Sequence, residues 1–349
     1  MSEIRYDSTT EDWVIIAPER ANRPSQKPKV KIDTNLPDWD ESCPFCPGNE
    51  DQTPDEVLRL PADNAGSAWA VRVVPNRFSA LSPEGAPARI DEGHLFRKMN
   101  GFGIHEVIIE SPHHNIPLAM MTYQQVEKIL TAYQERYNTL KANKDLRYIT
   151  IFKNHGFASG TSLVHPHSQL VATPIITPYY HRKFDIAHDY RATMGTCLYC
   201  DLLAGELEKG ERIVAETKKF VILQPYASRV PFETWIVPKE HAASFSLYPV
   251  SGLDELATAL KDTLFCIYHQ LENPAYNMMI DTSTTEDEED PYYHWHIRIV
   301  PRLSTIAGFE IGSGIYITTA LPETTADMLR QCCISFSEDG NVCLVPFPV

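Results

Sequence analysis

Cysteine and histidine recur in this sequence at spacings that could bind a metal ion. A Cys-x-x-Cys pair occurs twice, and its members are Cys43, Cys46, Cys197 and Cys200. A His-x-His motif also occurs twice, and its members are His165, His167, His294 and His296. Two cysteines in one tight loop supply half of the ligands that a tetrahedral zinc ion requires, and histidine nitrogens commonly supply the rest. The pattern therefore predicts two metal sites.

One further histidine lies between each cysteine pair and its His-x-His motif. His114 precedes its motif by 51 residues, and His241 precedes its motif by 53. The same order at nearly the same spacing predicts a duplicated unit, with one closed, structural zinc site in each copy. The predicted ligands are Cys43, Cys46, His114 and His165 in the first copy, and Cys197, Cys200, His241 and His294 in the second.

Other interpretations of these cysteines and histidines stay open at this point. A Cys-x-x-Cys pair alone also fits a redox dithiol or buried free thiols, although neither pair opens the strand-helix-strand pattern of thioredoxin-like proteins. The spacing does not decide between His113 and His114, nor between His294 and His296. Zinc is the expected metal at both sites, with iron as an alternative at the second.

The stretch from residue 160 to residue 171 carries the strongest signal for catalysis. In an extended chain, residues 165, 167 and 169 lie on one face, so His167 and Gln169 would lie beside a metal-bound His165. An imidazole held in this way can attack phosphorus when its other nitrogen donates to a carbonyl group. The Gln169 amide can stabilise charge that develops on the non-bridging oxygens. The alternative is that His167 is one more buried or metal-bound histidine.

Small and polar residues precede this stretch. Asn154, Gly156 and residues 159–162 offer amide, hydroxyl and backbone donors within a short segment. Because successive N–H groups in such a segment form a cavity for anions, we expect a phosphate-binding loop here.

Hydrophobic periodicity predicts the elements that position these residues. One long helix is expected in each half, at 122–141 and 253–271. The expected strands are 13–17, 68–74, 105–110, 148–153, 168–172, 220–223, 234–237, 276–280 and 297–300. Pro174 and Pro178 are expected to break the chain. Many strands without β-α-β alternation predict an α+β fold of mostly antiparallel sheet with flanking helices, divided into halves at residues 1–190 and 191–349.

The composition excludes several classes of protein. The chain has 349 residues, with 31 Lys and Arg against 46 Asp and Glu, so its formal net charge is −15. This charge argues against general nucleic-acid binding, which needs a basic surface to displace counterions. No apolar run approaches the roughly 20 residues of a membrane-spanning helix, and the N-terminal sequence has no signal-peptide pattern, so a cytoplasmic location is expected.

Several motifs in order give the sequence a specific resemblance to a known family. They are 19–24 (Glu-Arg-Ala-Asn-Arg-Pro), 43–46 (Cys-Pro-Phe-Cys), 74–78 (Val-Pro-Asn-Arg-Phe), 111–114 (Ser-Pro-His-His), 165–169 (His-Pro-His-Ser-Gln), 294–296 (His-Trp-His) and 308–310 (Gly-Phe-Glu). Over nearly its whole length the chain resembles the galactose-1-phosphate uridylyltransferase family of the histidine-triad superfamily. The resemblance implies two histidine-triad-like halves. The second half is expected to be catalytically degenerate, because Arg298 stands where the first half has Gln169.

The resemblance also implies roles for individual residues. His167 matches the family's nucleophile, which forms a covalent nucleotidyl-imidazole intermediate, and Gln169 matches a contact of the transferred phosphoryl group. Matching positions for substrate are Arg20, Asn76, Phe78 and Asn154 for the nucleotide, Ser162 for phosphate and Glu310 for sugar hydroxyls. The implied reaction is a ping-pong transfer of a nucleoside monophosphate from a nucleotide sugar to a phosphorylated acceptor. A homodimer is also implied.

The sequence departs from the family pattern in ways that bear on the substrate. Ser168 replaces the glycine of His-Pro-His-Gly-Gln, and residues 307–317 and the second cysteine pair look more like the branch that includes ADP-glucose phosphorylase, which transfers an adenylyl group to phosphate. We therefore expect first a UDP-glucose:hexose-1-phosphate (galactose-1-phosphate) uridylyltransferase and second an ADP-glucose phosphorylase. A zinc-stabilised nucleotide-binding protein without turnover is the third expectation. Triad hydrolases carry a third histidine at the position of Gln169. Because glutamine cannot pass a proton to a leaving group, Gln169 favours transfer over hydrolysis.

Overall fold

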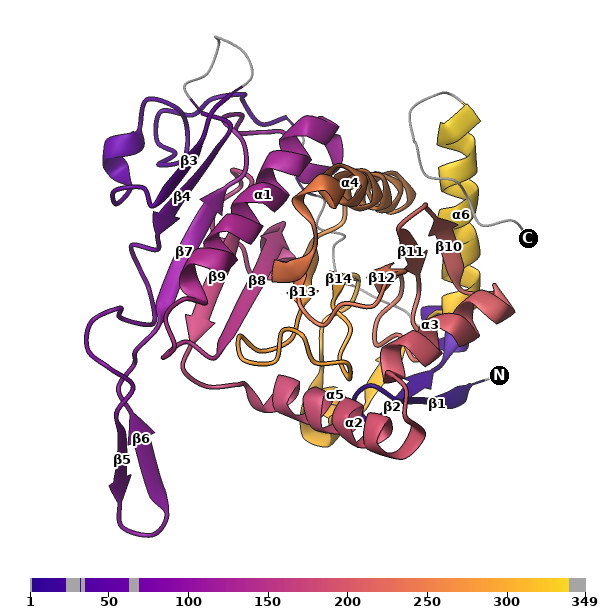
Figure 1. The fold of residues 1–349 in the computed structure, drawn as a ribbon. Coiled ribbons are helices and arrows are strands. Elements are labelled where there is room, and N and C mark those ends of the chain that lie inside the picture. The colour runs from indigo at the N-terminus through magenta and orange to yellow at the C-terminus, as the bar shows by residue number, and fades with distance from the viewer. Residues whose placement is uncertain (1, 23–31, 33–34, 63–68, 339–349) are drawn as a thin grey trace.

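A ten-stranded sheet forms the centre of the protein (Figure 1). The computed structural model describes residues 2–22, 32, 35–62 and 69–338. All neighbouring strands of this sheet are antiparallel. In sheet order they are β10 (Ile213–Glu216), β11 (Phe220–Leu223), β12 (Thr234–Pro238), β14 (His296–Pro301), β13 (Tyr276–Asp281), β8 (Tyr148–His155), β9 (His167–Thr173), β7 (Ile104–Ile109), β4 (Val71–Pro75) and β3 (Leu58–Leu60).

The strand order makes the internal duplication visible. From the centre outward, one half reads β8, β9, β7, β4, β3 and the other reads β13, β14, β12, β11, β10. Each half also carries one long helix between its third and fourth strand of this sheet in chain order, α1 (Tyr123–Leu140) or α4 (Leu253–Gln270). The two halves meet where β8 pairs with β13, so that Asn154 lies opposite Asn277.

The long helices pack against one another over one face of the sheet (Figure 1). Helix α1 begins after Thr122, whose side chain accepts the N–H of Gln125 and so caps the first turn. Its apolar positions recur at helical spacing, and all of them are buried: Val126, Ile129, Leu130, Tyr133 and Tyr137. Side chains from one face of the strands complete this core, among them Ile108, Leu170, Ile151, Met278 and Ile299. The opposite face of the sheet carries His105 of β7, Asn154 of β8, and His167 and Gln169 of β9.

The remaining elements surround the sheet. A second sheet joins β1 (Glu3–Asp7), β2 (Asp12–Ile16) and β15 (Tyr316–Thr318). The other α-helices are α2 (Pro178–Met194), α3 (Leu198–Lys209), α5 (Gly308–Ser313) and α6 (Pro322–Glu338). Single 3-10 turns are η1 (Pro18–Asn22), η2 (Glu50–Gln52), η3 (Leu118–Met120), η4 (Phe157–Ser159), η5 (Phe245–Leu247) and η6 (Val250–Gly252).

A two-stranded hairpin extends away from the main body (Figure 1). It consists of β5 (Arg89–Glu92) and β6 (Phe96–Met99), and every residue of both strands is exposed. Leu95 at its turn is 84% exposed and Phe96 is 70% exposed. An isolated hairpin of two strands has little stability of its own in water, so these apolar side chains mark a surface without a partner in the single chain.

The predicted α+β fold with mostly antiparallel sheet and flanking helices is confirmed. The expected break after the 168–172 strand is consistent with the end of β9 at Thr173, and Pro178 then begins α2. The missing N–H of proline costs nothing at the first helical position, where no carbonyl is available to accept it. The division at residue 190 stays a prediction; that residue lies within α2. In the described part of the chain, no helix has the length and apolar character to cross a membrane.

Candidate active site and metal centres

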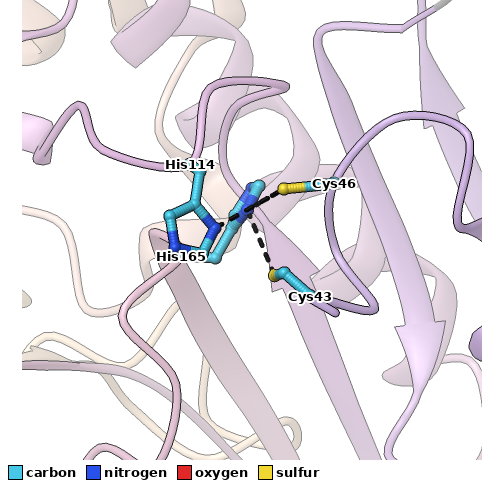
Figure 2. Close-up of side chains that lie close together, drawn as sticks. All are labelled: Cys43, Cys46, His114 and His165. Atoms are coloured by element: carbon cyan, nitrogen blue, oxygen red, sulfur yellow. Dashed lines mark hydrogen bonds between the residues drawn. The ribbon is translucent and has the colours of Figure 1, made fainter. Parts of the chain in front are cut away.

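The four ligands predicted for the first metal site point toward one another (Figure 2). The Sγ atoms of Cys43 and Cys46 each lie 3.6 Å from Nδ1 of His165, and Cys46 Sγ lies 3.5 Å from Nδ1 of His114. All four residues are buried. A tetrahedral zinc ion, with Zn–S near 2.3 Å and Zn–N near 2.0–2.1 Å, places sulfur and nitrogen ligands about 3.6 Å apart. The four side chains therefore fit one tetrahedral metal ion.

Groups around this cluster hold its ligands in position. His165 donates its Nε2–H to the carbonyl oxygen of Ser111 at 2.8 Å, which leaves Nδ1 for the metal. Asn49 donates to the carbonyl oxygen of Cys43 at 2.8 Å and so fixes the loop between the cysteines. Burial raises the pKa of the Cys43 thiol to about 12, so the thiolate needs a cation beside it to form at neutral pH.

The structure distinguishes between the two neighbouring histidines, His113 and His114. His114 belongs to the buried cluster, whereas the exposed His113 places its Nδ1 2.8 Å from Oδ1 of Asp38. The adjacent residues point in opposite directions, and only one of them reaches the cysteines.

The second cluster is more open than the first. Cys197, Cys200 and His241 place their ligand atoms within 4.8 Å of one another, and His241 is exposed. His294 Nδ1 lies 3.4 Å from His241 Nδ1 and 3.9 Å from Cys200 Sγ, but it is not part of the group in which all ligand atoms are mutually close. Its Nε2–H donates to the carbonyl of Pro238 at 2.9 Å, as His165 does to Ser111. Four donors therefore gather here, three of them in a compact group.

The second cysteine pair also differs from the first in its backbone. Cys197 is the N-cap of α3, so Cys200 lies in the first turn of this helix rather than in a loop. The pair was expected in a loop, and that expectation was wrong for Cys200. A helical turn supports the same Cys-x-x-Cys geometry because it brings residues three apart to one side.

One ring nitrogen of His167 is held by the backbone. It opens β9, is 7% exposed, and donates its Nδ1–H to the carbonyl oxygen of His165 at 2.8 Å. A neutral ring with Nδ1 protonated carries its lone pair on Nε2. Burial lowers the pKa of His167 below its ordinary value of 6.5, which favours this neutral form. The ring packs edge to face against Phe45, which lies between the first two cysteines, and the two ring centroids are 5.4 Å apart.

Gln169 lies two residues along β9, on the same face as His167. Its Oε1 lies 2.8 Å from Nε2 of His105 in β7. A ring N–H that donates to this oxygen leaves the amide NH2 of Gln169 to face a ligand. Asn76 extends the group, because its Nδ2 lies 3.1 Å from the same His105 nitrogen.

Asn154 and the turn that follows it are held by a residue from the second half. Asn277 of β13 donates to Oδ1 of Asn154 at 2.7 Å and to the carbonyl oxygen of Ser159 at 2.9 Å. Gly156 begins the turn with a φ of 75°, where an added Cβ would lie 2.9 Å from that of Ala275. Glycine is thus required here by both conformation and space.

Other residues predicted to bind substrate lie at the surface. Arg20, Phe78 and Ser162 are exposed, and Asn76 accepts the N–H of Phe78 at 2.9 Å. Residues 23 and 24 of the 19–24 motif lie outside the described residues. Glu310 accepts the N–H of Ala307 at 3.0 Å and so caps α5. Helix α5 contacts β15 of the second sheet, and in the described part of the chain no hydrogen bond joins Glu310 to His167.

Three residues at the site escaped prediction from the sequence: Phe45, His105 and Asn277. Phe45 stands between the paired cysteines, so a predicted metal loop beside His165 could have indicated it. His105 and Asn277 reach their partners only through the register of β7 with β9 and of β13 with β8. No local pattern in the sequence reveals those pairings.

The corresponding strand of the second half has different surroundings. His296 is completely buried, donates Nδ1–H to the carbonyl of His294 at 3.1 Å, and stacks on Trp235. Asp281 lies 3.4 Å from His296 Nε2, 3.3 Å from Arg298 Nε and 2.8 Å from Lys183 Nζ. The cations Arg298 and Lys183 hold the pKa of Asp281 well below its ordinary range despite its burial. In the second half, ion pairs therefore lie at the positions that correspond to His167 and Gln169 in the first half.

Comparison with known proteins places the whole chain in one family. Residues 1–177 match the model of the galactose-1-phosphate uridyl transferase N-terminal domain, and residues 183–338 match that of its C-terminal domain. ADP-glucose phosphorylase of Arabidopsis thaliana is 38% identical over 333 residues, which are 94% of this chain and 92% of that protein. Galactose-1-phosphate uridylyltransferase of Thermotoga maritima is 29% identical over 340 residues, covering 95% and 98%.

Solved structures of these relatives share the fold. The crystal structure of the Arabidopsis thaliana ADP-glucose phosphorylase with bound ADP-glucose superposes with a TM-score of 0.80 at 35% identity, covering 95% of this chain and 98% of that one. A uridylyltransferase structure gives a TM-score of 0.73 at 26% identity, with the same coverage. The chain therefore belongs to the galactose-1-phosphate uridylyltransferase family of nucleotidyltransferases.

Proposed function

We propose that this protein transfers a nucleoside monophosphate from a nucleotide sugar to a phosphorylated acceptor, with His167 as the nucleophile. The observation that carries the proposal is the orientation of this ring: Nδ1–H is bound to the His165 carbonyl, and Nε2 is left with the lone pair. Gln169 lies beside it on the same face of β9. A buried imidazole whose tautomer is fixed in this way suits covalent catalysis.

The chemistry takes place in two steps at phosphorus. Nε2 attacks the α-phosphorus of the nucleotide sugar, a bond forms between nitrogen and phosphorus, and the bond to the β-phosphate oxygen breaks to release sugar 1-phosphate. A phosphate oxygen of the acceptor then attacks the nucleotidyl-histidine and displaces the imidazole. The Nδ1–H bond to the His165 carbonyl supports the positive charge of the ring while the adduct lasts. The Gln169 amide supports the charge on the non-bridging oxygens.

Two donor and acceptor pairs fit this chemistry. We place UDP-glucose with hexose 1-phosphate first, as galactose-1-phosphate uridylyltransferase, the activity for which the matching family is named. ADP-glucose with inorganic phosphate is the second candidate, supported by 38% identity to an ADP-glucose phosphorylase. Ser168, the departure from the family pattern, does not separate them by direct contact. It alternates with His167 and Gln169 along β9 and so lies on the opposite face.

Metal content and assembly are part of the proposal. Zinc is the proposed ion at both clusters, because paired thiolates with imidazoles suit it and four ligands leave no open position. Iron remains the alternative at the more open second cluster. The exposed hairpin β5–β6 supports a homodimer, and free paired cysteines support a reducing, cytoplasmic location.

The test is formation of the covalent adduct. The protein is mixed with UDP-glucose or ADP-glucose without acceptor, and its intact mass is measured. A uridylyl adduct supports the first candidate and an adenylyl adduct the second. Subsequent addition of galactose 1-phosphate or inorganic phosphate should discharge the adduct.

Two variants control this test. His167→Gly should form no adduct while retaining its fold and metal. His296→Asn, the equivalent change in the second half, should still form it. The absence of an adduct from any nucleotide sugar, or turnover by His167→Gly, would refute the proposal.

A further inference from the structure

A charged pair lies directly behind the nucleophile. Strand alternation places His167 and Gln169 on one face of the sheet and Ser168 on the other, which α1 covers. Lys153 of β8 and Glu110, which follows β7, also lie on the covered face. Their side chains are 2% and 0% exposed, and Nζ lies 2.6 Å from Oε2 of Glu110. No sequence motif connects these two residues with catalysis.

Lys153 and Glu110 both bind the backbone of the nucleophile segment. Lys153 Nζ donates to the carbonyl oxygen of His167 at 3.2 Å. Glu110 donates its backbone N–H to the carbonyl oxygen of Pro166 at 3.1 Å. The preceding carbonyl, of His165, accepts Nδ1–H of His167 at 2.8 Å. Three consecutive carbonyl groups around the nucleophile are therefore each fixed by a donor.

The second carboxylate oxygen of Glu110 is also bound. Oε1 accepts hydrogen bonds from the hydroxyl groups of Ser168 and, at 3.2 Å, of Tyr133 in α1. Glu110 thus joins the residue after the nucleophile to the helix behind the sheet. A buried charge pair is costly to desolvate, and an apolar pair could fill the same space without binding any backbone carbonyl.

We infer that Lys153 and Glu110 are positioning residues, which hold the His167 backbone so that Nε2 lies in line with the phosphorus under attack. This inference rests on the proposed function. It predicts a specific kinetic defect, because a displacement of about 1 Å at a reacting atom costs roughly 100-fold in rate. Neither residue touches the donor, so donor binding should be spared.

The test compares two variants with a matched control. Lys153→Met should lower the single-turnover rate of adduct formation by roughly 100-fold, and Glu110→Gln, which keeps the side-chain shape, by roughly tenfold. The dissociation constant for the donor should stay within about twofold in both, measured by calorimetry at a temperature where circular dichroism shows the native fold. Lys153→Arg, which keeps a cationic donor, should recover much of the rate.

The control is Arg136→Met, which removes another buried ion pair on the same covered face of the sheet. Arg136 of α1 lies 2.6 Å from Glu106 of β7, and none of its hydrogen bonds reaches the 165–167 carbonyls. This variant should lose thermal stability but form adduct at the wild-type rate per folded molecule.

The outcomes separate the inference from the proposed function. A wild-type protein without adduct would refute the function itself. Adduct formation at the wild-type rate in folded Lys153→Met or Glu110→Gln would overturn only the positioning role, as would an equal loss of rate in Arg136→Met. If Lys153→Met fails to fold, Glu110→Gln and Lys153→Arg decide the question by the same comparison of rate with donor affinity.

Discussion

Hydrogen bonds from neighbouring strands orient the two side-chain amides of the site. The oxygen of Gln169 faces His105 and the oxygen of Asn154 faces Asn277, at 2.8 and 2.7 Å. In both residues the NH2 group is left for an anionic ligand. Donors fixed before the ligand arrives need no reorganisation when charge develops on phosphorus.

Asn277 offers a test at this scale, because it belongs to the half that does not contain the proposed nucleophile. Asn277→Ala removes the donor to Asn154 and to the Ser159 carbonyl, so the amide and its turn lose their fixed orientation. We expect donor binding to weaken roughly tenfold, the effect of one or two hydrogen bonds of about 1 kcal/mol each. Calorimetric titration with the nucleotide sugar measures this change in donor affinity. Unchanged affinity would show that Asn154 needs no support from β13.

The individual residues show how far the sequence could predict the site. The cysteine and histidine spacings indicated the first cluster, where all four predicted ligands converge. Strand alternation alone predicted that His167 and Gln169 lie on the same face of β9. Lys153, Glu110 and Asn277 could not be predicted in this way, because their contacts depend on which distant strands are neighbours and on their register. The resemblance associated Glu310 with sugar binding, whereas in this chain its carboxylate caps α5.

At the scale of elements, the two cysteine pairs differ in their distance from the chemistry. The first pair contributes Phe45 against His167 and holds His165, only two residues from the nucleophile. The second pair begins α3 and gathers beside His294 in the other half. Loss of metal should therefore have different consequences at the two sites.

Cys43→Ser and Cys197→Ser test this difference. Both should lower the melting temperature by several degrees and remove one equivalent of metal, because metal-binding free energy contributes to folding. Only Cys43→Ser should also slow adduct formation in the molecules that remain folded, since the loop carrying Phe45 loses its anchor. Thermal melts, metal analysis and intact mass provide the measurements. Equal adduct rates in the two variants would contradict the distinction, and melting unaffected by chelator would count against structural metals.

Helices were predicted correctly where their buried apolar residues recur at a regular helical spacing. The 122–141 and 253–271 helices correspond to α1 and α4 within one residue at each end, since both bury a regular apolar stripe. Helices α2 and α3 were missed. In α2 only Tyr180, Lys183, Phe184 and Ala187 are buried, and one of these is charged, so the apolar stripe is broken. Lys183 is buried because it pairs with Asp281, a tertiary contact that the local sequence cannot show.

The hairpin β5–β6 provides a test for the whole molecule. If it binds a second copy of the chain, replacing its exposed apolar side chains by charge should dissociate the dimer. We expect the double variant Leu95→Asp/Phe96→Asp to sediment as a monomer at micromolar concentration. Met194→Asp, which changes another exposed apolar residue, at the end of α2, should leave sedimentation unchanged. A double variant that sediments like the wild type would assign the hairpin another role.

The two halves of the sheet belong to one chain and meet where β8 pairs with β13, and this affects how each half can evolve. In an assembly of two identical chains, every substitution appears in both sites at once. Here both copies lie in one polypeptide, so a substitution in one copy leaves the other copy unchanged. In this chain Arg298 of the His296 strand pairs with Asp281, whereas the His167 strand has Gln169 at the corresponding place, and β13 supplies Asn277 to Asn154 of β8. One polypeptide that carries both halves therefore allows each half to change independently of the other.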